Sequence, residues 1–63
     1  MKYKTDTGRI LVEPSGDSFY RVVITRKGWP DYECYAAARS HYEAAKMAYR
    51  NRFGEDTIIT AMI

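Results

Sequence analysis

Alternating apolar and polar positions predict three strands in the first half of the chain. Residues Arg9–Glu13 form a short apolar run that ends at the turn-forming residues Pro14–Asp17. Residues Ser18–Arg26 are rich in β-branched and aromatic side chains, which favour strands, and Lys27–Asp31 is a second turn. Residues Tyr32–Ala38 then alternate in size and polarity. This pattern predicts two successive β-hairpins.

The third strand separates into two sides because successive side chains of a strand point in opposite directions. The side expected to face the core carries Tyr32, Cys34, Ala36 and Ala38. The other side carries Glu33, Tyr35 and Ala37.

A helix is predicted after the third strand, because an apolar pattern with helical period lies between a helix start signal and a helix stop signal. Ser40 and Glu43 have the spacing of a capping box, in which the serine hydroxyl accepts from the Glu43 N–H and the glutamate reaches back. Gly54 is placed to end the helix in a left-handed conformation. The apolar stripe consists of Tyr42, Ala44, Ala45, Ala48, Tyr49 and Phe53. Met47 lies off this stripe, and the alanines allow close approach to a sheet.

Residues 57–63 read as a last strand, which we expect to join the same sheet. The sequence therefore predicts an α+β fold of order β-β-β-α-β, with one small antiparallel-rich sheet and the helix on one face. We expect a single domain over residues 1–63, with its core in residues 19–63 and residues 1–8 frayed.

Composition narrows the class of protein. Sixty-three residues with one cysteine allow no internal disulfide, and Cys34 with the lone His41 cannot complete a structural zinc site. No apolar run reaches the length of a membrane span, and no signal-peptide pattern follows Met1. We therefore expect a cytoplasmic protein that does not contact a membrane. The net charge of +2 and the pI of about 8.8 fall just short of the values typical of dedicated nucleic-acid-binding domains, so charge is a weak indication of function.

Candidate catalytic chemistry is sparse. His41 has no evident proton partner or orienting group, and Cys34 falls on the predicted core side, where cysteine behaves as a small apolar residue. The acidic residues show no metal-ligand spacing, and no phosphate-binding glycine motif is present. We predict no enzymatic activity, no metal and no cofactor.

One helix cannot cover both faces of the sheet, so one face is expected to be open. Residues predicted to bind a partner there are Arg21, Thr25 and Tyr35, with Trp29 at the rim in the second turn. Arg, Tyr and Trp are the residue types most common at interaction hot spots. An ordinary solvated sheet face also has this mixed composition.

Several segments together resemble small accessory proteins of phages, plasmids and integrative elements. The resemblance covers residues 19–63 and is carried by Tyr20–Thr25, Tyr35–Ala38, Arg39–Ser40, Glu43–Ala45, Phe53–Gly54 and Ile58–Ile59. These give the family's order of strand, turn, strand, "A-x-S-x-x-E-A", helix, "aromatic-Gly" and strand. The resemblance implies stoichiometric binding to a host protein or complex, as in inhibitors of host defence such as anti-CRISPR proteins.

A second resemblance points to nucleic acid. Three strands followed by a helix is similar to the arm-type DNA-binding domains of tyrosine recombinases and to plant ethylene-response-type domains. In those domains, Arg and aromatic side chains of the sheet enter the major groove of DNA. The resemblance implies that the corresponding DNA contacts here are made by Arg21, Thr25, Lys27, Trp29 and Tyr35. Alternative phosphate contacts are Lys27, Lys46 and Arg50. A homodimer through an exposed edge strand is a third alternative.

Overall fold

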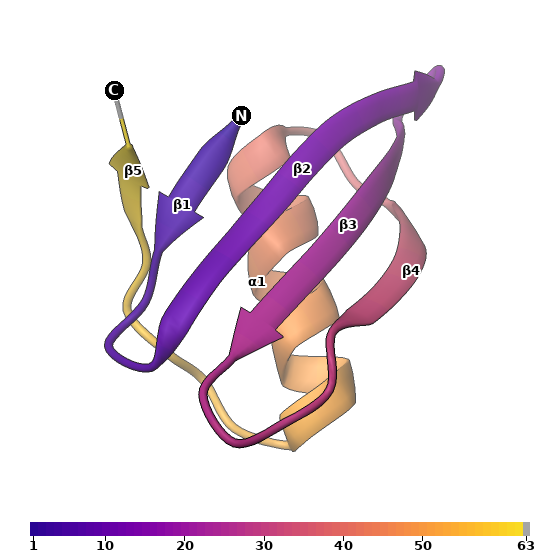
Figure 1. Cartoon of the computed structure of the whole chain (residues 1–63). Coiled ribbons are helices and arrows are strands. Elements are labelled where there is room, and N and C mark those ends of the chain that lie inside the picture. The colour runs from indigo at the N-terminus through magenta and orange to yellow at the C-terminus, as the bar shows by residue number, and fades with distance from the viewer. Residues whose placement is uncertain (63) are drawn as a thin grey trace.

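The computed structural model describes residues 1–62 as one five-stranded antiparallel sheet with a single helix behind it (Figure 1). The elements are β1 (Lys2–Lys4), β2 (Gly8–Gly16), β3 (Phe19–Arg26), β4 (Tyr32–Ala37), α1 (His41–Phe53) and β5 (Thr60–Met62). The strand order across the sheet is β4-β3-β2-β1-β5. This confirms the predicted α+β class and the return of the last strand to the same sheet. The last strand begins at Thr60 rather than at residue 57, and residue 63 of the predicted strand lies outside the described residues. Within residues 1–62, no helix is both long and apolar enough to span a membrane.

Strand β1 is the main departure from the predicted order. Residues 1–8 were expected to fray, but Lys2–Lys4 pair with β2 on one side and with β5 on the other. Tyr3 is 4% exposed and belongs to the core. Ile10 and Val12 of β2 are also fully buried, so the core does not begin at residue 19. A three-residue strand carries too short an alternation to be recognised by period alone.

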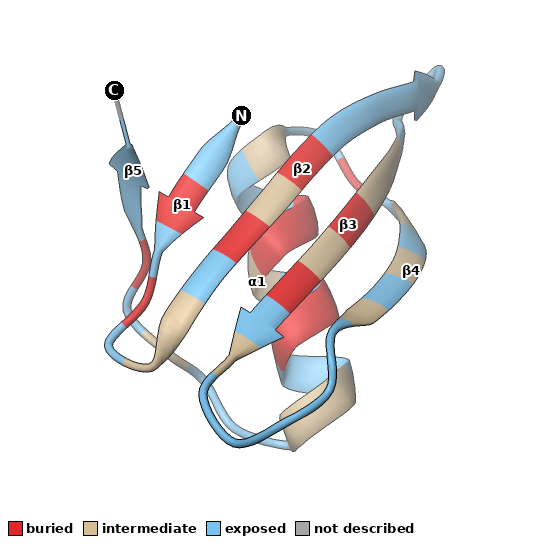
Figure 2. Cartoon of the chain, viewed as in Figure 1, coloured by how far each residue is buried: buried red, intermediate tan, exposed pale blue. Residues whose placement is uncertain are grey.

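The core lies between the helix and one face of the sheet. In Figure 2 the buried residues alternate along β2 and β3, as expected for strands covered on one side. The largest fully buried side chains are Ile10, Val12, Val22 and Ile24. From the helix, the buried residues are Ala44, Ala45, Ala48 and Tyr49, which confirms these four members of the predicted stripe, while Phe53 is partly buried. Tyr42 is half exposed, and its ring meets that of Tyr3 edge-on at 6.2 Å.

The helix boundaries follow the predicted signals. Ser40 is the N-cap, and its hydroxyl accepts from the Glu43 N–H at 3.1 Å. The reciprocal bond to the Glu43 carboxylate is absent from the hydrogen bonds of residues 1–62. Gly54 has φ 71°, and its N–H donates to the Arg50 carbonyl at 2.8 Å, so the helix ends as predicted.

The hairpin of β2 and β3 is longer than predicted. Strand β2 continues through Pro14 to Gly16 with a bulge between these two residues, so the turn is confined to Asp17 and Ser18. Ser18 adopts φ 52°. Beyond the bulge Gly16 pairs with Phe19, the first residue of β3, and Phe19 also pairs with Ala37 of β4.

Candidate interaction surfaces

The sheet has one face that the helix does not cover, here called the open face. It faces the viewer in Figure 1, with α1 behind the sheet. Paired residues of antiparallel strands point to the same side, so the register assigns the side chains of this face. One row across the sheet contains Lys4, Arg9 and Thr25, and the next contains Lys2, Leu11, Val23 and Glu33. A third row contains Glu13, Arg21 and Tyr35.

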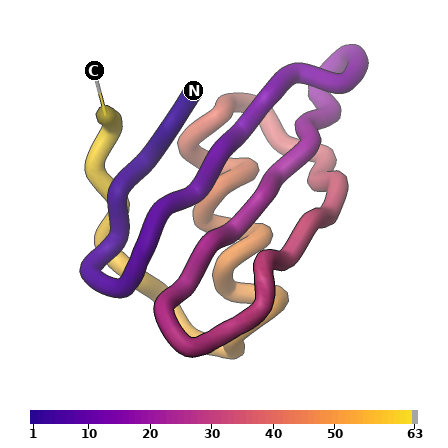
Figure 3. The backbone as a smooth tube through the Cα atoms, in the orientation of Figure 1, coloured from indigo at the N-terminus to yellow at the C-terminus, as the bar shows by residue number. Residues whose placement is uncertain are grey.

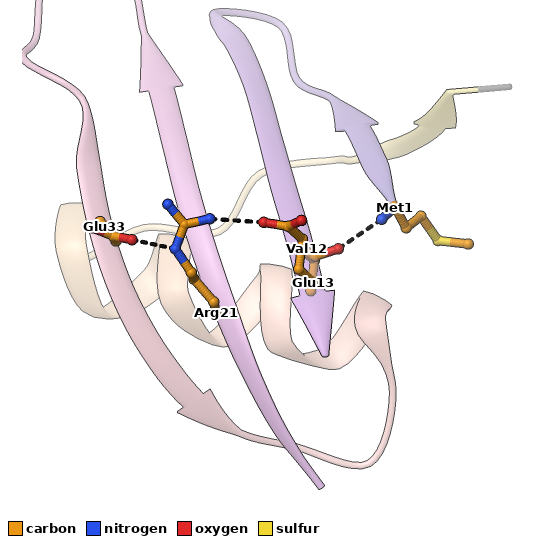
Figure 4. A network of polar contacts seen from close by, with 5 residues as sticks. All are labelled: Met1, Val12, Glu13, Arg21 and Glu33. Carbon is orange, nitrogen blue, oxygen red and sulfur yellow. Dashed lines mark hydrogen bonds and ion pairs between the residues drawn. The ribbon is translucent and has the colours of Figure 1, made fainter. Parts of the chain in front are cut away.

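Arg21 is held between two carboxylates on the open face (Figure 4). Its Nη1 donates to Glu13 Oε1 at 2.7 Å, and its Nε donates to Glu33 Oε2. The hydrogen bond with Glu33 and the charge of that carboxylate raise the pKa of the Arg21 guanidinium above its ordinary value. Three strands therefore contribute to one fixed charge network. Because two negative charges surround one positive charge, Arg21 is not a free phosphate-binding group.

Phe19 and Tyr35 form a stacked aromatic pair next to this network. Their ring centroids are 5.7 Å apart with an interplanar angle of 12°. Phe19 is 40% exposed and Tyr35 is 55% exposed, so the stack is fixed by mutual contact rather than by burial. The sequence predicted Tyr35 as a binding residue but missed Phe19. Its place on the open face follows from the alternation of β3, which puts Phe19 on the same side as Arg21, and its contact with Tyr35 follows from the β3–β4 register.

A basic corner, defined by Lys2, Lys4 and Arg9, occupies the opposite part of the open face. Lys4 and Arg9 are direct cross-strand partners, and Lys2 pairs with Leu11 one row further. None of the ion pairs within residues 1–62 includes one of these three side chains. Sequence reasoning missed this cluster because β1 was not recognised as a strand.

Trp29 lies away from the open face, contrary to its predicted place at the rim. Its ring is edge-on to Phe53 of the helix at 5.4 Å. The guanidiniums of Arg26 and Arg52 each lie within 5.5 Å of the centroids of both rings. Arg26 also pairs with Glu55 at 3.3 Å. Cation–π contacts of this kind attach the β3–β4 turn to the end of the helix, so Trp29 does not join Arg21 and Tyr35.

The remaining predicted contact residues are dispersed. Thr25 lies on the open face opposite Arg9. Lys46 donates from Nζ to the Thr57 carbonyl at 2.6 Å and so fastens the segment that leads to β5. Arg50 is exposed on the helix, and Lys27 is exposed in the β3–β4 turn. These basic residues do not gather into one phosphate-binding surface.

The two residues considered for catalysis pack as structural groups. Cys34 is a free, partly buried thiol against the core, and burial raises its pKa. A thiol with a raised pKa is a weak nucleophile near neutral pH. The His41 ring packs against Tyr20 with centroids 4.8 Å apart. Within residues 1–62, no group of three or more His, Cys, Asp or Glu side chains is arranged to hold a metal ion.

Comparison with protein-family models, with curated proteins and with solved structures finds no match to this chain.

Proposed function

We propose that this chain is a non-enzymatic binding protein that engages a protein partner stoichiometrically through its open face. The observation that supports this proposal is the fixed arrangement of Arg21 beside the stacked Phe19 and Tyr35. Hot-spot residue types that are already ordered lose little conformational entropy on binding. An interface whose aromatic and arginine side chains are ordered before binding therefore has a lower entropic cost of association.

The same geometry favours a protein partner over nucleic acid. Phosphate binding requires cations that can replace counterions along the backbone. At the centre of the open face, the two carboxylates of Glu13 and Glu33 outnumber the one guanidinium of Arg21. The network therefore carries a net negative charge, which repels phosphates. Nucleic acid is retained as the second candidate because of the basic corner of Lys2, Lys4 and Arg9.

The nature of the partner rests on the sequence resemblance to accessory proteins of mobile elements. On that basis the partner is a host protein or complex, and the chain acts on it as an inhibitor or modulator, for example of a defence system. Such a protein works in the host cytoplasm and needs no cofactor.

A matched pair of tyrosine variants tests the proposal. Tyr35→Ala removes an exposed ring from the open face, whereas Tyr42→Ala removes a similarly exposed ring from the helix side. We expect a protein captured from bacterial extract by the native chain to be lost with Tyr35→Ala and retained with Tyr42→Ala, at moderate and at high salt. Both variants are first checked for folding by circular dichroism.

The nucleic-acid alternative is measured with the same proteins. Binding to random duplex and single-stranded DNA is followed as a function of salt for the native chain and for Lys4→Glu/Arg9→Glu. DNA binding that falls steeply with salt and is abolished by this double variant would replace the protein-partner proposal, provided that Tyr35→Ala captures the same extract proteins as the native chain.

A further inference from the structure

The two edges of the sheet differ in length and protection. Strand β5 spans three residues, whereas β4 spans six, Tyr32–Ala37. Edge strands are usually protected by proline, lysine or a covering segment. Strand β4 contains neither proline nor lysine, and its one charged residue, Glu33, is paired with Arg21. In Figure 3 no other described segment of the chain lies along the outer side of β4.

The hydrogen-bond pattern shows which backbone groups of β4 point outward. The Ala38 N–H donates to the Ser18 carbonyl at 3.0 Å, in continuation of the β3–β4 register. Hydrogen-bonded pairs alternate along an antiparallel ladder. The residues that bond toward β3 are therefore Tyr32, Cys34 and Ala36. The residues whose N–H and C=O groups point to the free edge are Glu33, Tyr35 and Ala37.

We propose that a second copy of this chain adds its own β4 antiparallel to this edge, with Tyr35 opposite Tyr35 of the second copy. In this register Glu33 lies opposite Ala37 of the second copy, and every outward N–H and C=O group of β4 gains a partner. If Cys34 lay opposite Cys34 of the second copy instead, the outward N–H and C=O groups of Ala37 would face Asp31 of the second copy, which lies outside β4. Placing Glu33 opposite its copy would bring like charges together, which destabilises a cross-strand pair.

The side chains complement this register. The Phe19–Tyr35 stack ends at the free edge with Tyr35 more than half exposed. A two-fold axis between the two Tyr35 residues would continue the stack into a row of rings from both copies across the open face. Cross-strand aromatic pairs stabilise sheets, and the same patch meets itself in a symmetric dimer. The dimer would leave the open face exposed, so it does not require the protein partner proposed above.

A proline substitution separates edge pairing from folding. The Ala37 N–H points to the free edge, so Ala37→Pro removes an intermolecular donor while the ladder with β3 stays intact. Light scattering over a concentration series is expected to show the native chain passing from monomer to dimer. For Ala37→Pro the dissociation constant is expected to rise about tenfold or more, as for the loss of one to two hydrogen bonds. A native chain that remains monomeric, or an Ala37→Pro variant that dimerises equally well, overturns the proposal.

Cross-linking tests the register independently. In the proposed dimer Cys34 lies opposite Ala36 of the second copy, at a Cα separation of about 4.5 Å that suits a disulfide. Under oxidised glutathione, Ala36→Cys is expected to yield a covalent dimer. Ala37→Cys is the matched control, because position 37 lies on the opposite face from Cys34 and should not link to it. Equal linking in both variants, or linking of the native chain through Cys34 alone, overturns the register.

Discussion

At the scale of single residues, Gly8 lies directly against the backbone of β3. Gly8 opens β2 opposite Arg26, and a Cβ atom at this position would lie 1.9 Å from the Thr25 carbonyl oxygen. The atom in the way belongs to the backbone, so no side-chain movement relieves the contact. This glycine lets the first turn of the chain close onto the end of β3.

We expect Gly8→Ala to lower the free energy of unfolding at or above the upper end of the range of about 1–3 kcal/mol that is typical of overpacking. Gly28→Ala is the comparison. Gly28 has open space around it but a φ of 85°, so alanine there costs about 1–2 kcal/mol from backbone strain alone. Urea denaturation of both variants measures the difference. Equal losses would show that the β2 end moves freely away from Thr25.

At the scale of elements, the helix contacts the sheet through small side chains. Ala44, Ala45 and Ala48 are buried, whereas Met47 is 39% exposed. We expect Ala48→Leu to destabilise the protein by about 1–3 kcal/mol, because the added atoms have no space at this close approach. Met47→Ala should cost less, since its side chain lies off the buried stripe. The reverse order in chemical denaturation would contradict this packing.

The elements also show where sequence reasoning succeeds. The helix and its Ser40 and Gly54 signals are local, and local hydrogen bonds decide them. The alternation of β4 was likewise confirmed, with Cys34 toward the core and Tyr35 outward. The Glu13–Arg21–Glu33 network was not predicted as such, because it depends on the registers that join β2, β3 and β4, and the sequence pattern does not fix these registers. The position of Trp29 depends on the conformation of one turn, which its sequence leaves open.

At the scale of the whole molecule, β1 connects the two ends of the chain. It lies between β2 and β5, and β5 reaches the sheet only through it. The Met1 amino group donates to the Val12 carbonyl at 2.6 Å (Figure 4). The Val12 N–H in turn donates to the Met1 carbonyl at 2.8 Å. The pairing of β1 with β5 joins residues from the two ends of the chain, such as Lys2 and Met62. A contact so distant in sequence leaves no local pattern, which explains why residues 1–8 appeared unstructured from the sequence alone.

Tyr3 is the side chain through which β1 contributes to the core, and its removal tests this architecture. We expect Tyr3→Ala to lower the free energy of unfolding by about 3–5 kcal/mol, as for other buried aromatic residues. Because β5 depends on β1, backbone amides of residues 60–62 should lose hydrogen-exchange protection more than those of β3. Tyr42→Ala is the control, since Tyr42 contacts Tyr3 but is half exposed and should cost much less. Similar losses for the two variants, with protection in β5 unchanged, would mean that β1 is peripheral and that β5 is held by the Lys46–Thr57 contact instead.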